Sequence, residues 1–242
     1  MVIAKRITSW SFSRYSTYKE CPFKAKLKFI DKLQEPGNAA MERGTAVHKA
    51  AEDFIKGAQK KLAKELDPVA AIVKACRAFF KKRKVESDAV CEDTWAFTID
   101  WARTAWDDWK NCVSRIKLDF AHVELRGKKR ILIITDWKTG KFSRWKLEEY
   151  LEQLELYALA ALILYPDVDE IWPRLVFTDQ NIVHPQEEGE IKFTHAADLK
   201  RLKLLWHKRV SPMLCDTKFA PRPGDHCSRC HFRKDNGGPC KF

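Results

Sequence analysis

The chain has 242 residues and a mass of 28.2 kDa, a length that fits one domain with a sizeable core. Lys and Arg total 45 against 33 Asp and Glu, and this net charge of +12 favours a polyanionic partner such as nucleic acid. No stretch reaches the roughly 18 to 20 consecutive apolar residues of a membrane helix, and no signal-peptide core is visible. We therefore expect a cytoplasmic protein that binds no membrane, in which grouped cysteines are metal ligands before they are disulfides.

The first third of the chain is predicted to be helical. Ser11 to Phe29 predicts a helical hairpin that is interrupted at Cys21-Pro22. Apolar residues at helical spacing predict a second helix from Glu42 to Lys56. A third helix is expected from Pro68 to Lys82, followed by a strand around Thr94 to Ile99.

The centre of the chain predicts a β-hairpin. Arg115 to Leu125 and Arg130 to Trp137 are rich in strand-forming residues, and Arg126 to Lys129 separates them as a turn. The second arm is strongly apolar from Ile131 to Ile134.

The remaining elements alternate between helix and strand. Leu147 to Leu164 has helical periodicity, and Ile171 to Thr178 with Asn181 to His184 is predicted to form a strand pair. Helical sequence returns from Ala196 to Arg209, before a tail that carries three cysteines. This order predicts an α/β or α+β domain built on one sheet.

The hairpin brings two carboxylates together. With Gly127 and Lys128 in the turn, the numbers of facing residues sum to 255, so Asp119 lies opposite Asp136. Like charges on directly opposed residues of a hairpin are destabilising, and a divalent cation such as Mg²⁺ or Mn²⁺ would compensate them. Because side chains alternate along a strand, Lys138 shares the face of Asp136.

This arrangement suits phosphodiester hydrolysis. Asp119 and Asp136 would hold the metal, while Lys138 would orient or deprotonate the attacking water. The alternative is a hairpin end with merely solvated aspartates, but that would not explain the apolar run that leads into Asp136.

These residues resemble a known family. Ile134 to Gly140, with the sequence Ile-Thr-Asp-Trp-Lys-Thr-Gly, resembles the last strand motif of the PD-(D/E)xK nuclease superfamily in its RecB-like form. That form includes CRISPR-associated RecB-like and many phage exonucleases. Further blocks agree with it: Ser11 to Ser13, Tyr18 to Pro22, Gly44 to His48, Gln153 to Tyr157, and the terminal cysteines.

The resemblance implies a restriction-endonuclease-like α/β fold, a mixed sheet core flanked by helices. It implies a single RecB-like nuclease domain over residues 1–242. Its helical N-terminal part would span 1–90, its nuclease core 91–210, and its cysteine-rich tail, 211–242, would pack back on the N-terminal part.

The resemblance also implies further site residues. His48 would be a metal ligand together with the backbone carbonyl of Trp137, and Gln153 and Tyr157 would face the scissile strand. From the residues alone, a lone helical histidine such as His48 is more often structural, and Gln153 and Tyr157 read equally well as packing residues. Asp119 departs from the family pattern, in which a Gly-x-Ile/Val segment precedes the first aspartate, so Glu124 is its alternative. Glu52, four residues after His48, is an outer-shell candidate.

The cysteines form a separate candidate site. Cys227-x-x-Cys230 and Cys240 supply three thiolates, and a tetrahedral site needs a fourth ligand. The resemblance assigns Cys21 to this place, in a [4Fe-4S] cluster. The spacing from Cys230 to Cys240 is longer than in the usual family tail, so a zinc site that includes His226 or His231 stays open.

The sequence thus predicts a metal-dependent DNA exonuclease that acts on single strands or duplex ends. We expect a role in recombination, repair or the processing of phage or mobile-element DNA, in a bacterial cell or a phage-infected host. Because no Gly-x-x-x-x-Gly-Lys-Ser/Thr loop occurs, strand separation would come from a helicase or recombinase partner. The alternatives are a CRISPR-adaptation nuclease and a catalytically silent, metal-stapled DNA-binding module.

Overall fold

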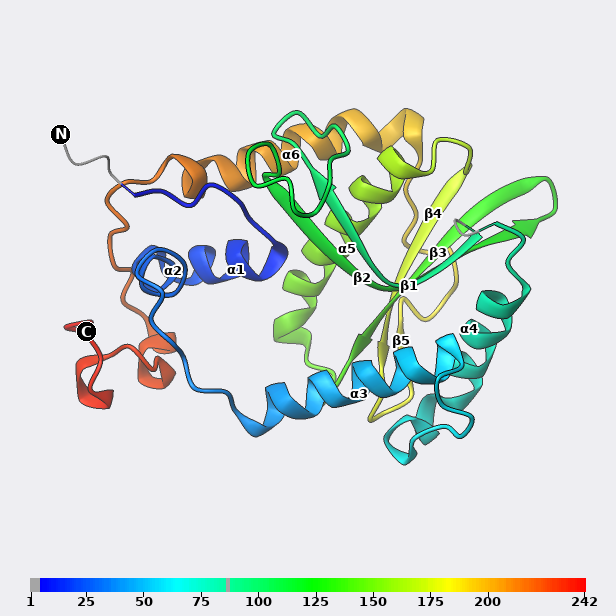
Figure 1. Cartoon of the computed structure of the whole chain (residues 1–242), viewed down its shortest axis with the longest axis horizontal. Coiled ribbons are helices and arrows are strands. Elements are labelled where there is room, and N and C mark those ends of the chain that lie inside the picture. The colour runs from blue at the N-terminus through cyan, green and yellow to red at the C-terminus, as the bar shows by residue number, and fades with distance from the viewer. Residues whose placement is uncertain (1–4, 86–87) are drawn as a thin grey trace. The chain divides into compact units, whose positions relative to one another are not determined.

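The computed structural model describes residues 5–85 and 88–242 (Figure 1). Its helices are α1 (Phe12–Glu20), α2 (Pro22–Phe29), α3 (Ala39–Lys56), α4 (Ala70–Lys82), α5 (Arg144–Leu164) and α6 (His195–Cys215). Short 3-10 helices are η1 (Lys64–Val69), η3 (Asp225–Arg229) and η4 (Lys234–Asn236). The strands are β1 (Ala89–Phe97), β2 (Ser114–Arg126), β3 (Lys129–Lys138), β4 (Glu170–Phe177) and β5 (Ile182–His184).

The chain divides into two compact units, each made of separate stretches of sequence. The sheet unit consists of Asn38–Trp95 and Ile116–Lys203. The cysteine unit consists of the residues up to Gly37, Ala96–Arg115 and Leu204–Phe242. The first helices and the tail therefore belong to one unit, whereas α3, η1 and α4 belong with the sheet.

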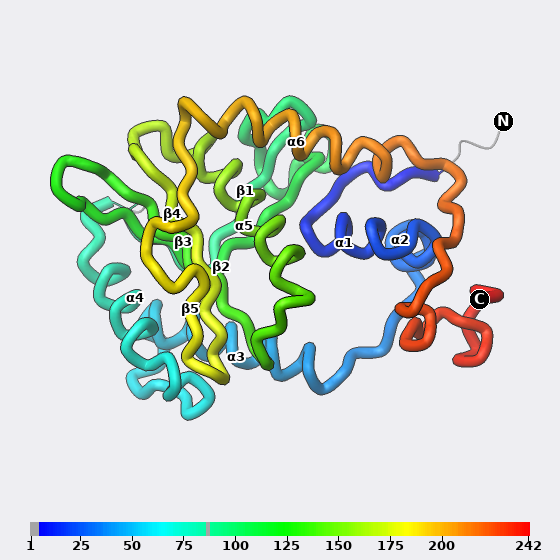
Figure 2. Tube along the Cα trace, turned by 180° about the vertical axis from the view of Figure 1, so that it is seen from behind, coloured from blue at the N-terminus to red at the C-terminus, as the bar shows by residue number. Residues whose placement is uncertain are grey.

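The sheet has five strands in the order β1-β2-β3-β4-β5. β2 and β3 are antiparallel, and their register runs from Phe120 opposite Thr135 to Arg126 opposite Lys129. These pairs sum to 255, so the predicted turn and register are confirmed. β3 and β4 are parallel, and α5 connects them, as the tube in Figure 2 shows. The α/β prediction of a mixed sheet flanked by helices is therefore also confirmed.

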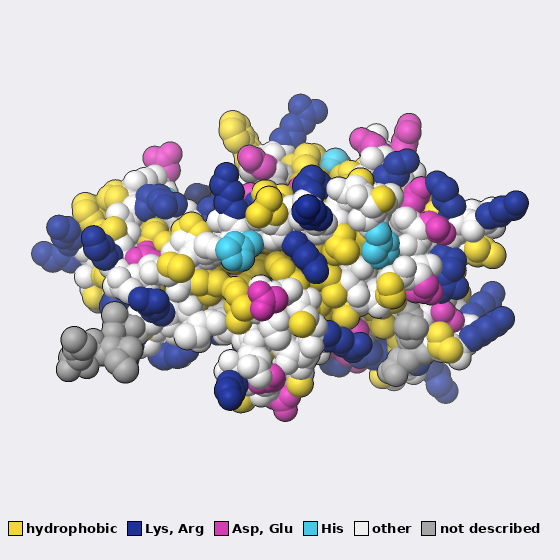
Figure 3. All heavy atoms as spheres, turned by 90° about the horizontal axis from the view of Figure 1, so that it is seen from above, with side chains coloured by type: hydrophobic (Ala, Val, Ile, Leu, Met, Phe, Trp, Pro, Cys, Tyr) yellow, Lys and Arg dark blue, Asp and Glu magenta, His cyan; other side chains and the backbone are white. Residues whose placement is uncertain are grey.

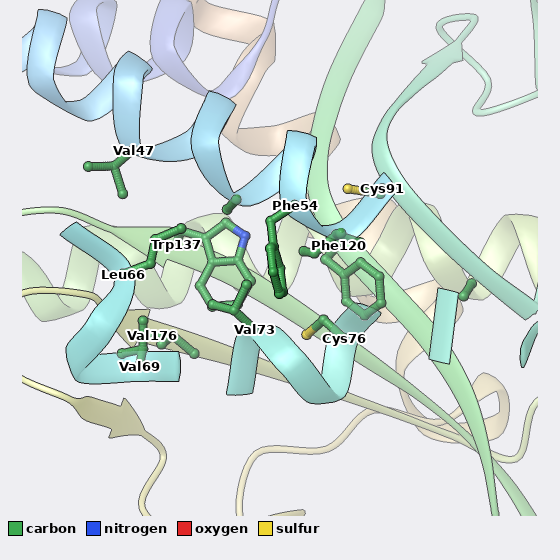
Figure 4. Packing of buried hydrophobic residues seen from close by; sticks show 13 residues of the cluster. Val47, Phe54, Leu66, Val69, Val73, Cys76, Cys91, Phe120, Trp137 and Val176 are labelled. Carbon is green, nitrogen blue, oxygen red and sulfur yellow. The ribbon is translucent and has the colours of Figure 1, made fainter. Parts of the chain in front are cut away.

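One face of the sheet packs against α3, η1 and α4. Trp137 and Phe120 from the strands meet Phe54 of α3 and Val73 of α4 in a cluster of buried apolar residues (Figure 4). Because side chains alternate along a strand, the neighbours of Trp137 on β3 point to the opposite face. There the hydroxyl of Tyr157 on α5 donates a hydrogen bond to Asp136. A single strand thus supplies both the core and the candidate site.

Most predicted elements are present, with shifted ends. α3 begins earlier than predicted, because the Asn38 side chain accepts a hydrogen bond from the Met41 N–H and caps the helix. β1 begins at Ala89, well before the predicted Thr94, and α6 continues through Pro212 to Cys215. Among the described residues, no helix is long and apolar enough to cross a membrane.

Gly189 is a sensitive position of the sheet unit. Its φ is +78°, and a Cβ there would lie 2.9 Å from the Trp172 ring. Gly127, in the hairpin turn, has a φ of +63° but nothing within 4 Å of a Cβ. We expect Gly127→Ala to cost roughly 1–2 kcal/mol of unfolding free energy through backbone strain alone. Gly189→Ala should cost at least about 1 kcal/mol more, because the ring must also move.

Urea unfolding of the two variants beside the parent chain measures this difference. Equal losses for both substitutions would contradict the prediction and would mean that Trp172 yields without cost.

Candidate active site

The candidate site lies where β2 and β3 stop pairing. Asp119 comes from β2, Asp136 and Lys138 come from β3, and His48 comes from α3. All four belong to the sheet unit. Asp119 and Asp136 are 7% and 2% exposed, so the site holds two buried carboxylates that need compensating charge.

Asp119 is held by both of its oxygens. Oδ2 accepts a hydrogen bond of 2.8 Å from the Trp137 N–H, and Oδ1 lies 3.2 Å from Nδ1 of His48. Burial and the nearby Asp136 raise the pKa of Asp119, although the His48 and Trp137 contacts act in the opposite direction. A cation at this place would relieve that cost.

Glu92 on β1 completes a group suited to a metal ion. One ligand atom each from His48, Glu92 and Asp119 lie within 4.8 Å of one another. Lys117 pairs with Glu92 at 2.7 Å from the exposed side. A nitrogen and two carboxylate oxygens form a donor set that suits Mg²⁺ or Mn²⁺, with Mn²⁺ the more tolerant of the imidazole.

Sequence reasoning did not select Glu92. The strand was expected to start only at Thr94, which left Glu92 outside any element. Glu92 also has a φ of +51°, a left-handed conformation that breaks the alternation of the strand. The one local signal for Glu92 in the sequence is that this acidic residue directly follows the apolar Val90 and Cys91.

Gln153 and Tyr157 of α5 form hydrogen bonds with Lys138 and Asp136 of β3. Lys138 Nζ lies 2.7 Å from Oδ2 of Asp136 and donates to Oε1 of Gln153 at 2.8 Å. The Tyr157 hydroxyl donates to Oδ1 of Asp136 at 2.9 Å and accepts from Nε2 of Gln153 at 2.7 Å. Gln153 and Tyr157 therefore fix the positions of Lys138 and Asp136.

The acidic residues of the site shift the pKa values of its basic groups upward. Burial lowers the pKa of Lys138, but Asp136 and Asp119 outweigh burial and leave the pKa raised. The pKa of His48 is raised in the same way, because Asp119, Asp136 and Glu92 outweigh the effect of burial. Burial and the two aspartates place the pKa of Tyr157 well above its ordinary value, so its hydroxyl remains a donor.

The two alternative acids are engaged elsewhere. Glu124 pairs with His122 at 2.9 Å and with Arg126 at 2.8 Å, and these contacts lower its pKa to about 2. Glu52 pairs with two lysines of its own helix, Lys49 and Lys56. Among the described residues, neither acid belongs to the group formed by His48, Glu92 and Asp119.

The predicted cysteine ligands share a cavity in the cysteine unit. Cys21, Cys227, Cys230 and Cys240 all line it, together with His226. All four thiols are free, and Nε2 of His226 is buried without a hydrogen-bond partner. His231, the other histidine of the tail, is not among the lining residues.

The positive charge is unevenly divided along the sequence. The cysteine unit has 19 Lys and Arg against 9 Asp and Glu, a formal charge of +10. The sheet unit has 26 against 24, a formal charge of +2. Figure 3 shows a face on which Lys and Arg side chains are widely spread and acidic side chains are fewer. The excess positive charge of the chain thus lies chiefly in the cysteine unit.

Comparisons with known proteins identify the family of the chain. A solved structure called "Putative exonuclease" from Eubacterium rectale is 12% identical, with a TM-score of 0.52 over 93% of this chain and 87% of that one. A second structure, called SSO0001, is 13% identical over 95% of this chain and 86% of that one, but its TM-score of 0.41 is too low to establish a shared fold. No curated protein matches the sequence. The family model of the PD-(D/E)XK nuclease superfamily matches residues 9–234, and the chain therefore belongs to that superfamily.

Proposed function

We propose that the chain is a metal-dependent deoxyribonuclease that hydrolyses phosphodiester bonds from a DNA end. The observation that carries this proposal is the group of His48, Glu92 and Asp119, which lies beside the Asp136–Lys138 pair. A site for a hard cation next to a buried ammonium group suits attack on a phosphodiester. Membership in a nuclease superfamily supports the same reaction.

The residues take distinct roles in this proposal. His48, Glu92, Asp119, Asp136 and the Trp137 carbonyl would hold Mg²⁺ or Mn²⁺. When bound, the metal polarises the phosphoryl oxygen and lowers the pKa of its water.

Lys138 orients that water and offsets negative charge that develops on the phosphate. Its contacts with Asp136 and Gln153 hold the ammonium group in place for these roles. Gln153 and Tyr157 are positioning residues, which hold Lys138 and Asp136 by hydrogen bonds.

The proposal extends to the substrate and the cellular role of the protein. The structural neighbour called an exonuclease and the basic cysteine unit support a DNA substrate that is held near an end. We place the protein in the cytoplasm, in recombination, repair or the processing of phage or mobile-element DNA. A helicase or recombinase partner would supply separated strands.

We propose a [4Fe-4S] cluster at the four cysteines of the cysteine unit. The residues fit such a group, because four free thiols line one cavity. His226 lines the same cavity, so zinc held with its imidazole is the alternative that the metal content decides.

Asp136→Asn tests the nuclease. It removes a metal-binding charge and should lower Mn²⁺-dependent degradation of 5′- and 3′-labelled DNA by at least on the order of 100-fold. Binding of the same DNA in EDTA should be retained. Glu187→Gln, an exposed acid outside the site, is the control. A wild-type chain that binds labelled DNA but leaves it intact with Mg²⁺ and Mn²⁺ would instead identify a silent binding module.

Glu92→Gln tests the ligand that sequence reasoning missed. We expect the Kd for Mn²⁺, measured by titration calorimetry, to rise about tenfold or more, because a carboxylate ligand is lost. Glu52→Gln is a matched control, since Glu52 follows His48 on α3 but pairs with lysines. A similar Kd for both variants would exclude Glu92 as a ligand.

Cys227→Ser tests the cluster. Anaerobically purified wild-type protein should be coloured and contain iron, whereas the variant should lose both the visible absorbance and the iron. Cys215→Ser is the matched control, because Cys215 is exposed and does not line the cavity. A colourless wild-type protein that carries zinc would overturn the iron–sulfur proposal.

A further inference from the structure

Trp145 is almost completely exposed. It lies in the first turn of α5, and its exposed fraction of 96% is the largest among the exposed large hydrophobic residues of the described chain. An indole has a wide apolar face that is favourably buried, and Trp145 lies on the helix that carries Gln153 of the candidate site.

The loop before Trp145 is anchored. The Gly140 N–H donates to Oδ2 of Asp179 at 2.8 Å, and the Phe142 N–H donates to Oε1 of Gln180 at 2.5 Å. The Phe142 ring also packs against Phe177, with centroids 5.1 Å apart. Because these contacts fix the loop, α5 starts at a defined place and Trp145 is presented to solvent rather than left on a free segment.

The same elements connect Trp145 with the site. Gln153 follows Trp145 on α5 by eight residues, about 12 Å along the helix, and bonds to Lys138. α3 is close to the loop as well, since a Cβ on Gly44 would lie 3.3 Å from Oγ1 of Thr139. Met41, two turns before His48 on α3, is a second exposed apolar residue at 62%.

The charges around Trp145 indicate what binds there. Lys141, Arg144 and Lys146 are exposed, and the first acids after them are Glu148 and Glu149. A polyanion would therefore run along the loop side, over Lys141 and Arg144. A single indole with flanking cations is typical of a base-stacking contact, whereas a protein partner would need a broader apolar surface.

We propose that Trp145 stacks on an unpaired base of a single-stranded DNA substrate, while Lys141 and Arg144 contact the neighbouring phosphates. The stacked base lies a few nucleotides from the scissile phosphate, given the distance along α5. This inference rests on the proposed nuclease function and names its substrate. A base within a duplex is paired and stacked, so a duplex end binds at this place only after it frays.

The test compares wild type, Trp145→Ala and Trp145→Phe in EDTA, which prevents cleavage. The probes are a fluorescein-labelled single-stranded oligonucleotide and a blunt duplex of the same length, and the readout is fluorescence anisotropy. We expect Trp145→Ala to raise the Kd for the single strand about tenfold and Trp145→Phe to raise it less. The Kd for the duplex should stay unchanged. Trp109→Ala, at a tryptophan that is 81% exposed but stacked on Arg115, is the matched control.

Abasic oligonucleotides locate the contact. An abasic site at the stacked position should weaken binding to wild type about tenfold and have little effect on Trp145→Ala. Arg144→Ala should reduce the salt dependence of single-strand binding by about one phosphate contact.

Three results would overturn the inference: an unchanged single-strand Kd in Trp145→Ala, an equal loss for single strand and duplex, or an abasic scan that is identical in both proteins. These results are distinct from a failure of the proposed function, in which the wild-type chain would not degrade DNA with Mn²⁺ at all.

Discussion

The hydrogen bond from the Trp137 N–H to the Asp119 carboxylate is the contact on which the site depends. Backbone pairing between β2 and β3 is last seen at Phe120 and Thr135, and beyond that pair a side chain accepts from the neighbouring strand. This contact fixes a buried carboxylate beside Asp136, so negative charge is concentrated where water is excluded. The Lys138 ammonium lies against Asp136, and the His48 imidazole contacts Asp119. The site therefore concentrates buried negative charge that a bound cation would compensate.

Strand β3 links the arrangement of these charges to the stability of the fold. Trp137 is buried in the cluster between the sheet and α3, while Asp136 and Lys138 face α5. A shift of β3 by one residue would exchange these faces, placing charges in the core and the indole in the site. The parallel pairing with β4 and the hairpin with β2 both resist such a shift. The hydrophobic packing thus selects the register that the chemistry requires.

Sequence patterns predicted the parts of this arrangement that depend on local rules. Strand alternation and a two-residue turn were enough to give the hairpin register and the shared face of Asp136 and Lys138. Glu92 was missed, because its place depends on an irregular backbone and because the strand begins earlier than the sequence pattern predicts. The inward bonds of Gln153 and Tyr157 were missed as well, since helical spacing shows which residues share a stripe but not what that stripe faces. Local periodicity cannot reveal contacts that only the tertiary fold creates.

The division into units bears on how the chain is made. The last segment of the sheet unit ends at Lys203, whereas the cysteine unit requires everything from Leu204 onward. During synthesis, all residues of the sheet unit are therefore present while the first two helices still lack their counterpart. At about 5–20 residues per second, Cys21 is added about 10–40 seconds before Cys227. For the proposed cluster to form, Cys21 would have to stay reduced and unligated throughout that interval, so the cellular thiol pool and the supply of metal would then limit how much complete protein is formed.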